Sequence, residues 1–241
     1  MGLPFFGITM RKPVKCRHPG LRKTEIGMDS LTARVIQKGG FVMDTIWIAT
    51  GNAHKAEEFQ EMLGPSHQVK TLRNLEQMPE IDETGKTFEE NALIKARTLH
   101  GLLKEAVIAD DSGLEVDAMD KMPGIYSSRF MGEDTAYAIK NQAIIDTVDQ
   151  KEREEGRDRK ARFVCAIAWI EKDGTEHLYR GVMEGEIAHE ITGEGGFGYD
   201  PIFWFELFGT TSGNVPADLK NRYSHRHAAL EQFMKDWREK R

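Results

Sequence analysis

The chain has 241 residues, enough for one α/β domain or for two small lobes around one cleft. Its formal net charge of −6 argues against nucleic acid as a partner, so a polyanionic small substrate would need locally concentrated Lys and Arg. No apolar stretch approaches the ~18 residues of a membrane helix. Two cysteines without a CxxC pair, Cys16 and Cys165, favour a reducing, cytoplasmic setting, with Cys165 as a buried thiol.

Residues 1–42 differ from the rest of the chain. They carry scattered basic residues and no sustained apolar period, which predicts a poorly ordered extension. The sequence QKGG at 37–40 can be encoded by a purine-rich stretch that resembles a bacterial ribosome-binding site. We therefore expect Met43 to be the native start and residues 43–241 to form the domain. The alternative is a genuine targeting or partner-binding tail, which an intact mass of the native protein would reveal.

From Met43 onward the pattern becomes regular. It predicts strands at 45–49, 69–72, 106–109, 162–171, 177–184 and 202–205, and helices at 54–63, 87–103, 134–149 and 225–240. Residues 151–160 are expected to form a charged, solvated connection, and residues 173–174 a hairpin turn. This mixture of strand–helix units and hairpins predicts an α/β fold with a mixed sheet and helices on its faces.

A short turn with the sequence TGNAHK, residues 50–55, joins the first predicted strand to the first predicted helix. Its glycine lets the backbone approach a ligand closely, and free N–H groups at the start of the helix suit phosphate. Lys55 adds a positive charge, although the spacing is not that of a P-loop. The alternative is a plain strand-to-helix turn.

Two acidic residues, Asp82 and Glu83, precede the long predicted helix, whose start TFEE at 87–90 has a capping-box pattern. Asn91 and Lys95 are four residues apart, so they share one face of this helix. The alternative is that the acidic residues only complement the helix dipole.

The run ADDSGL, residues 109–114, follows a buried-type strand that is expected to end at Asp110. Two adjacent carboxylates, Asp110 and Asp111, are costly there unless something neutralises them. Magnesium binds carboxylates and phosphate oxygens, and strand ends are where open α/β sheets place ligands. The run therefore favours a metal site, with a surface turn as the alternative. A haloacid-dehalogenase nucleophile would need D-x-D-x-[TV], which is absent.

Two segments nearer the C-terminus could hold a base or a phosphate. The run GEGGFGYDP at 193–201 can fold around a planar ligand, with Phe197 stacked on a base, or it can be a glycine-rich hairpin with aromatic plugs. Lys220 and the run SHR at 224–226 offer hydrogen-bond donors. Ser224 also fits the N-cap of the last helix, which is the alternative for that segment.

Together and in this order, the motifs resemble the inosine triphosphate pyrophosphatase family, also called Ham1-like. The resemblance covers nearly all of residues 45–235. It is carried by ATGN at 49–52 with Lys55, ETG-x-TF-x-EN at 83–91 with Lys95, ADDSGL at 109–114, PGIYSSR at 123–129, GGFGYDP at 195–201 and SHR at 224–226.

The resemblance implies an α/β fold with a mixed, elongated central sheet, helices on both faces, and two lobes around an active-site cleft. It implies hydrolysis of the triphosphates of inosine, deoxyinosine and xanthosine (ITP, dITP and XTP) to the monophosphate and pyrophosphate, which cleans the nucleotide pool. It also implies a homodimer, with Mg²⁺ as cofactor. The net charge and the lack of a long apolar stretch predict neither nucleic acid nor a membrane as partner.

The same resemblance implies roles for individual residues. Asp111 is expected to be the general base and a metal ligand, and Asp82 or Glu83 to supply a second carboxylate, with Asp110 in support. Lys95, classed with Asp111 as catalytic, is expected to hold a phosphate. The residues expected to bind substrate are Thr50, Gly51, Asn52, Ala53, His54, Lys55, Ser112, Phe197, Gly198, Tyr199, Asp200, Lys220, His225 and Arg226.

Three positions depart from the family pattern. Many members have Glu at the position of Asp82, whose shorter reach leaves that assignment open. His54 replaces the glycine common before the phosphate-loop lysine, and residues 120–121 (DK) replace a frequent Gly-Gly. The last two can alter loop geometry, and neither removes a catalytic group.

Selectivity is expected to follow hydrogen-bond polarity, because hypoxanthine and xanthine carry an acceptor oxygen at position 6 where adenine carries an amino donor. Donors such as His225 and Arg226 would pair with the oxygen and leave adenine unmatched. GTP shares the 6-oxo group, so this pairing does not explain its rejection. A Maf-like nucleotide pyrophosphatase and a catalytically inactive nucleotide-binding sensor remain alternatives; retention of Lys55, Lys95 and Asp111 argues against the sensor.

Overall fold

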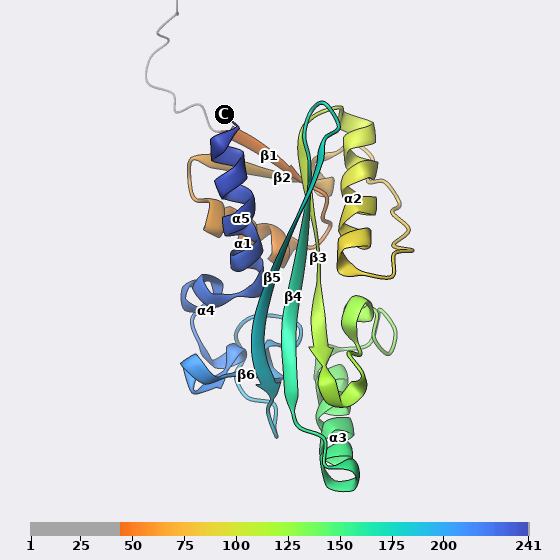
Figure 1. Cartoon of the computed structure of the whole chain (residues 1–241), viewed down its shortest axis with the longest axis vertical. Coiled ribbons are helices and arrows are strands. Elements are labelled where there is room, and N and C mark those ends of the chain that lie inside the picture. Colours follow the sequence, from red (N-terminus) through yellow and green to blue (C-terminus); the bar gives the residue numbers. More distant parts are fainter. Residues whose placement is uncertain (1–43, 241) are drawn as a thin grey trace, which may run out of the picture. The chain divides into compact units, whose positions relative to one another are not determined.

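The computed structural model describes residues 44–240, so the expected extension at 1–42 and the expected start at Met43 lie outside the described residues. The strands and helices are β1 (Asp44–Ile48), α1 (Ala53–Leu63), β2 (His67–Thr71), α2 (Phe88–Leu103), β3 (Val107–Val116), α3 (Tyr137–Glu155), β4 (Lys160–Ile170), β5 (Glu176–Ile187), β6 (Phe203–Phe205), β7 (Thr210–Thr211), α4 (Ala217–Tyr223) and α5 (His225–Glu239) (Figure 1).

One mixed sheet joins the seven strands in the order β2-β1-β3-β4-β5-β6-β7. The first three neighbours, β2, β1 and β3, run parallel, and every pairing from β3 to β7 is antiparallel. The predicted α/β fold with a mixed sheet is therefore confirmed. Strands β3, β4 and β5, of 10, 11 and 12 residues, are longer than the usual five or six.

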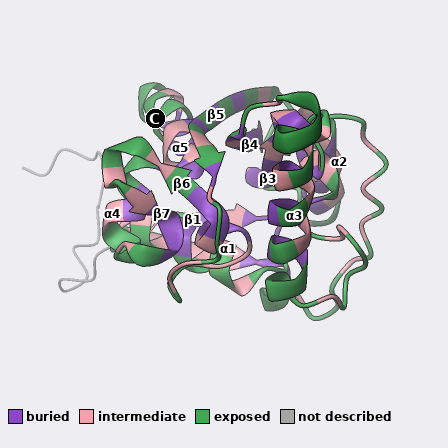
Figure 2. Cartoon of the chain, turned by 90° about the horizontal axis from the view of Figure 1, so that it is seen from below, coloured by how far each residue is buried: buried purple, intermediate pink, exposed green. Residues whose placement is uncertain are grey.

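Helices cover both faces of this sheet, because successive side chains of a strand point to opposite sides. In β4, Cys165 and Ile167 pack into a core shared with α1 and α5, whereas Val164 and Ala166 pack into a core shared with α2. Figure 2 shows this burial, with exposed residues along the outer sides of the helices. Cys165 is a buried thiol, as predicted, and burial raises its pKa to about 11.

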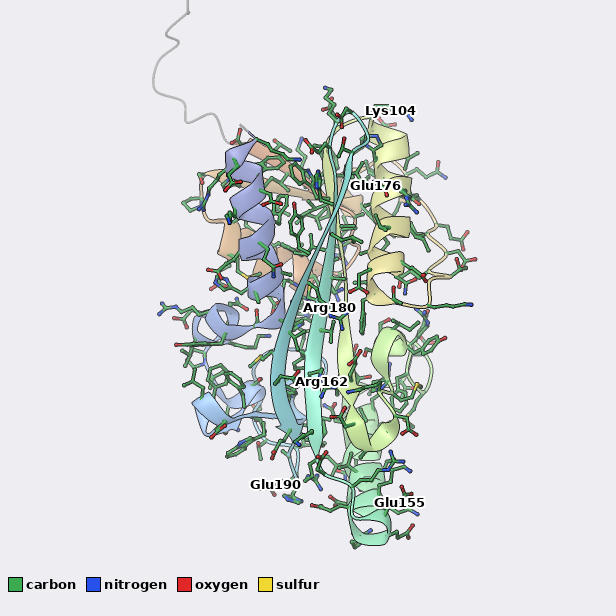
Figure 3. The ribbon with its side chains drawn as sticks, viewed as in Figure 1. Lys104, Glu155, Arg162, Glu176, Arg180 and Glu190 are labelled. Atoms are coloured by element: carbon green, nitrogen blue, oxygen red, sulfur yellow. The ribbon has the colours of Figure 1, made fainter. Side chains whose placement is uncertain are left out.

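A third core lies farther along β3 and β4, where Leu114 and Val116 pack with Ile144 and Val148 of α3. Exposed ion pairs also join α2 to β5. Arg97 lies 2.7 Å from Glu176, and Arg180 lies 2.6 Å from Glu89 (Figure 3, in which Glu176 and Arg180 are labelled). Such exposed pairs contribute little stability. The three buried cores therefore position the helices.

Helix starts follow the sequence closely. Thr87 caps α2 by accepting a hydrogen bond from the Glu90 N–H at 3.1 Å, and Ser224 caps α5 by accepting one from the His227 N–H at 3.1 Å. The capping box at α2 is only half formed, because the Glu90 carboxylate accepts from the Lys86 N–H instead. No helix among the described residues is long and apolar enough to span a membrane.

Two predicted elements differ most from the structure in their extent. The third helix begins at Tyr137 and continues to Glu155, so the first half of the expected connection at 151–160 is helical. Side chains four residues apart, including Lys151 and Glu155 at 3.1 Å, support this last stretch. The other error concerns Asp110, where the third strand was expected to end. Strand β3 instead continues to Val116, because β4 pairs with β3 along its whole length.

Candidate active site

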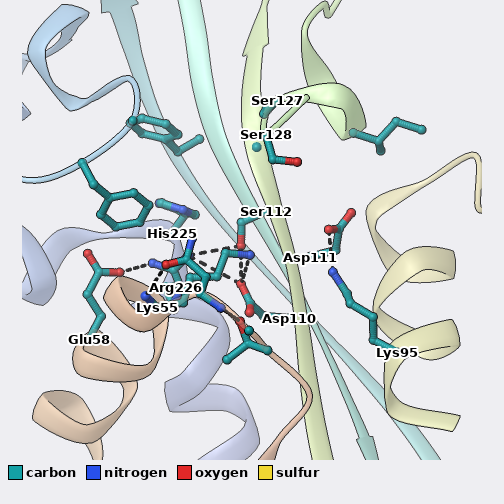
Figure 4. Close-up of a pocket in the computed structure, with 18 of the residues that line it drawn as sticks. Lys55, Glu58, Lys95, Asp110, Asp111, Ser112, Ser127, Ser128, His225 and Arg226 are labelled. Carbon is teal, nitrogen blue, oxygen red and sulfur yellow. Dashed lines mark hydrogen bonds and ion pairs between the residues drawn. The ribbon is translucent and has the colours of Figure 1, made fainter. Parts of the chain in front are cut away.

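A pocket of about 340 Å³ lies beside β3, just beyond the point where β1 ends. Strand β1 pairs with β3 only as far as Ile108, and the chain then turns into α1. The edge of β3 that β1 leaves carries residues 110–113 into the pocket. Figure 4 shows side chains from this strand meeting others from α1, α2 and α5.

The two adjacent aspartates of β3 project to opposite faces of the sheet, as neighbours in a strand must. The Asp110 carboxylate faces α1 and α5, with Lys55 Nζ at 2.8 Å. The Asp111 carboxylate faces α2, with Lys95 Nζ at 2.8 Å (Figure 4). Asn91 Nδ2 of the same helix lies 3.3 Å from Asp111. Their position inside β3 thus separates them into two different environments.

Asp110 belongs to a buried cluster of opposite charges. Burial would raise the pKa of this carboxyl, but Lys55 and Arg226 outweigh burial and hold the pKa well below its usual range. Ser112 donates a hydrogen bond to Asp110 at 2.7 Å, and Arg226 Nη2 lies 3.5 Å away. The second oxygen, Oδ1, is buried and has no hydrogen-bond partner among residues 44–240. Asp110 is therefore ionised and keeps one free acceptor.

Asp111 belongs to a second cluster around the Lys95 ammonium. Burial raises the pKa of Asp111, although Lys95 opposes this shift. Burial alone would lower the pKa of Lys95, but the carboxylates of Asp111, Asp110 and Glu83 raise it. Lys95 Nζ lies 3.2 Å from Glu83 Oε1, and Arg129 Nη1 lies 3.6 Å from Glu83 Oε2. A cation thus already sits between the carboxylates of Glu83 and Asp111.

The turn before α1 both caps the helix and lines the pocket. Asn52 Oδ1 accepts hydrogen bonds from the N–H groups of His54 at 2.9 Å and Lys55 at 3.3 Å. Thr50 Oγ1 accepts from the Asn52 N–H at 3.1 Å. The motif is therefore a strand-to-helix turn that also lines the pocket, and the His54 and Lys55 N–H groups that were expected to be free are bonded to Asn52.

The glycine-rich loop presents Phe197 to the pocket and anchors it through Asp200. Asp200 Oδ2 accepts from the Phe197 N–H at 2.8 Å and from Lys220 Nζ at 2.9 Å. Gly196 has a positive φ of 71°, and a side chain there would collide with Asp200. Lys220 Nζ also lies 5.1 Å from the centre of the Phe197 ring, within cation–π range.

Most predicted site residues meet in this pocket. Those that line it are Thr50, Gly51, Asn52, Lys55, Glu83, Lys95, Asp110, Asp111, Ser112, Phe197, Gly198, Tyr199, Asp200, Lys220, His225 and Arg226. Ala53, His54 and Asp82 are not among the lining residues, and the side chain of Asp82 is exposed. The structure therefore places Glu83 rather than Asp82 beside Lys95.

Glu58 is a pocket residue that sequence reasoning missed. Its carboxylate accepts from Arg226 Nη1 and from Lys220 Nζ, the latter at 2.8 Å. One feature of the sequence indicated that Glu58 could reach the pocket. It follows Lys55 by three residues, so both side chains lie on one face of α1. Other lining residues without a predicted role include Ser127, Ser128, Tyr137, Phe163 and Met183.

His225 is half-buried in the wall of the pocket. Its ring stacks on Phe163 at 4.9 Å between centres, and its Nδ1 has no hydrogen-bond partner in the described chain. Burial, assisted by Arg226 and Lys220, holds the pKa of His225 well below its usual value. The ring is therefore neutral at pH 7.

A second acidic group lies outside the pocket and does not resemble an open metal site. Asp149, Glu152 and His189 bring three ligand atoms within 4.8 Å of one another. Arg159 Nη1 already lies 2.5 Å from Asp149 and 3.0 Å from Glu152. This guanidinium supplies the positive charge that the two carboxylates need.

Comparison with known proteins agrees with this geometry. The Ham1 family profile matches residues 46–236. A dITP/XTP pyrophosphatase from Listeria monocytogenes is 42% identical over 195 residues, which cover 80% of this chain and 95% of that protein. A dITP/XTP pyrophosphatase from Bacillus cereus is 43% identical over 202 residues, which cover 81% and 97%.

Solved structures give the same result. A HAM1 protein from Coxiella burnetii superposes with a TM-score of 0.73 at 37% identity, covering 82% of this chain and 100% of that one. The Ham1 protein from Staphylococcus aureus superposes with a TM-score of 0.69 at 35% identity, with the same coverage. The chain therefore belongs to the Ham1 family.

Proposed function

We propose that this protein hydrolyses the non-standard purine nucleoside triphosphates ITP, dITP and XTP to the monophosphate and pyrophosphate. One observation carries the proposal: a single pocket joins the cluster of Glu83, Lys95 and Asp111 to the aromatic and basic group of Phe197 and Lys220. The first suits a triphosphate and the second a flat, oxygen-bearing base. The relatives named dITP/XTP pyrophosphatase support the same assignment.

Asp111 is our choice for the group that orients and deprotonates the attacking water. Phosphoanhydride hydrolysis needs an aligned nucleophile and neutralised phosphate charge. Lys95 and Asn91 hold the Asp111 carboxylate in the pocket, where its oxygens can accept a proton from water. Lys55 and Lys95 would neutralise phosphate oxygens. Asp110, which the buried cations hold ionised, would support Lys55.

The residues of the second cluster fit a magnesium ion. Glu83 and Asp111 both line the pocket and both lie beside the same Lys95 ammonium, and carboxylate oxygens are the ligands that Mg²⁺ prefers. Glu83 and Asp111 would hold the ion, while the exposed Asp82 is the weaker candidate. When bound, the ion would supply positive charge opposite the phosphate oxygens.

The far end of the pocket would select the base. Phe197 offers a ring for stacking, and Lys220, Arg226 and backbone N–H groups offer donors for a 6-oxo group. The amino group of adenine would leave those buried donors unmatched, which can produce large discrimination. We therefore propose a preference for ITP and XTP over ATP.

A nucleotide panel tests this function. The purified protein is given Mg²⁺ and ITP, dITP, XTP, GTP, ATP, a methylated nucleotide or a pyrimidine triphosphate, and pyrophosphate and phosphate are assayed separately. Fast pyrophosphate release from ITP, dITP and XTP is expected, and equal rates on ATP and ITP would contradict the selectivity. Preference for methylated or pyrimidine nucleotides would favour the Maf-like alternative, and binding without turnover would favour a sensor.

We also propose a homodimer and a cytoplasmic setting, as the family resemblance implies. The free, buried thiol of Cys165 is compatible with a reducing compartment. Light scattering after size exclusion tests the dimer, because one chain has a mass of 27.4 kDa. A mass near that value would contradict it.

A further inference from the structure

Two loops that line the pocket, residues 124–129 and residues 196–200, are tied together through the start of α3. Lys140 Nζ donates a hydrogen bond to the Ser128 carbonyl at 2.9 Å. Its neighbour Asn141 donates through Nδ2 to the Gly198 carbonyl at 3.1 Å. Tyr199 then donates through its hydroxyl to the Ser127 carbonyl at 2.6 Å.

These three hydrogen bonds form a closed ring. The peptide bonds of Ser127–Ser128, Lys140–Asn141 and Gly198–Tyr199 join each hydrogen bond to the next. We call this set of six residues the α3 ring. Neither loop can move away from the other, or from α3, without breaking at least one of the three bonds.

The burial of Lys140 costs free energy, because its side chain is charged. Its side chain is 0% exposed, and no carboxylate among the described residues lies within ion-pair distance of its ammonium. It also lies in the first turns of α3, where the positive end of the helix dipole disfavours a cation. An aliphatic side chain would occupy this space without the cost of a buried charge. A cation at this position makes two contacts that an aliphatic side chain could not make. Its Nζ donates the hydrogen bond to the Ser128 carbonyl, and it lies 5.0 Å from the centre of the Tyr137 ring.

The α3 ring lies between the two halves of the pocket. Arg129, the residue after Ser128, places Nη1 3.6 Å from Glu83 in the carboxylate cluster. Gly198 and Tyr199 continue directly from Phe197, which presents its ring to the pocket. The ring therefore joins the segment that contacts the hydrolytic cluster to the loop that would hold the base.

We propose that Lys140 and Asn141 are positioning residues that hold the base-binding loop and the Arg129–Glu83 contact in one arrangement. Neither residue lines the pocket, so each acts through the loop that it binds. Loss of Lys140 releases the segment at Ser128 and disturbs the hydrolytic cluster, whereas loss of Asn141 releases Gly198 and disturbs base binding. The inference rests on the proposed hydrolysis of ITP.

The two halves of the ring predict different kinetic changes. Lys140→Met keeps the length of the side chain but removes its charge and donor, so kcat for ITP is expected to fall about tenfold. Asn141→Leu removes the amide at similar size, so KM for ITP is expected to rise several-fold with a smaller change in kcat. Val148→Ala is the matched control, because it weakens the same helix in the core without touching the ring.

A double-mutant cycle tests whether the ring acts as one unit. If it does, Lys140→Met with Tyr199→Phe lowers kcat/KM by less than the product of the single effects, because both bonds hold the Ser127–Ser128 segment and loss of either one already loosens it. Multiplicative effects would overturn the proposal. The proposal would also be overturned if the ring variants lost no more kcat/KM than Val148→Ala does at an equal fall in Tm. If Lys140→Met fails to fold, Asn141→Leu with Tyr199→Phe gives the same test.

Failure of the proposed function has a different signature. If the wild-type protein binds ITP but releases no pyrophosphate, hydrolysis is contradicted, and the same cycle is measured on the Kd for ITP. Less-than-multiplicative losses there support the ring, and multiplicative losses overturn it.

Discussion

Asp110 and Asp111 are adjacent in β3, yet each carboxylate binds a different lysine on a different face of the sheet. Asp110 lies 2.8 Å from Lys55 of α1, and Asp111 lies 2.8 Å from Lys95 of α2. The four charges are therefore arranged as two separate pairs across one strand. This separation predicts that replacing each aspartate by asparagine changes a different property, turnover for Asp111 and stability for Asp110.

Asp111→Asn is expected to keep the fold and to lose most turnover, on the order of 10²-fold or more, because the amide cannot accept a proton from water. Steady-state pyrophosphate release from ITP measures the loss, and circular dichroism monitors the fold. A rate near that of the wild type would reject Asp111 as the base.

Asp110→Asn is the matched comparison, and its expected effect is on stability. Removing this charge leaves the half-buried Lys55 and the buried Arg226 without their shared carboxylate, a change that costs about 3 kcal/mol in comparable buried pairs. Urea unfolding measures the difference. Equal stability of the two variants would contradict the separation of roles.

Glu58→Gln is expected to weaken both the fold and base binding. Glu58 accepts from Arg226 and Lys220, so a neutral side chain leaves two buried cations short of negative charge. We expect a loss on the order of 2–3 kcal/mol in the free energy of unfolding, together with a higher KM for ITP. The control is Glu57→Gln, since the neighbouring Glu57 side chain is 75% exposed. Similar losses in both variants would contradict the role given to Glu58.

Glu58 also marks the limit of what local sequence patterns predict. Helices and strands follow from such patterns, and Thr87 and Ser224 are recognisable as helix caps from the sequence alone. Glu58 instead gains its role from Arg226, which is 168 residues away in the chain. No periodicity or spacing within α1 reports such a partner.

The unexpected length of β3 also depends on a partner that is distant in the sequence. Its apolar pattern stops at Ala109, so a strand end was expected, but the pairing with β4 continues through Asp111 to Val116. The charges inside this strand are tolerated because residues of three helices neutralise them. The motif residues were thus predictable, while their distribution over two faces depends on the tertiary fold.

The half-buried His225 is expected to make stability depend on pH. Its pKa in the native state is well below 6.5, so the native ring stays neutral while the unfolded ring binds a proton near pH 6. The unfolded state then holds more protons, so the free energy of unfolding falls as pH decreases through about 6.5. The slope contributed by one such group is at most ~1.4 kcal/mol per pH unit. Urea unfolding at several pH values should show a smaller fall for His225→Gln, and identical slopes would reject this account.

His54 is expected to support Phe197 from outside the pocket. The two rings stack with centres 5.4 Å apart and planes 12° apart, while Phe197 lines the pocket and His54 does not. An aromatic pair contributes ~0.5–1.5 kcal/mol, so His54→Ala should raise KM for ITP by about 2- to 10-fold with little change in kcat. His54→Phe should restore the wild-type KM, because a second ring can support Phe197 without the imidazole. If the phenylalanine variant behaves like the alanine variant, stacking is not what His54 supplies. An unchanged KM in the alanine variant would show that Phe197 is held by Asp200 and Lys220 alone.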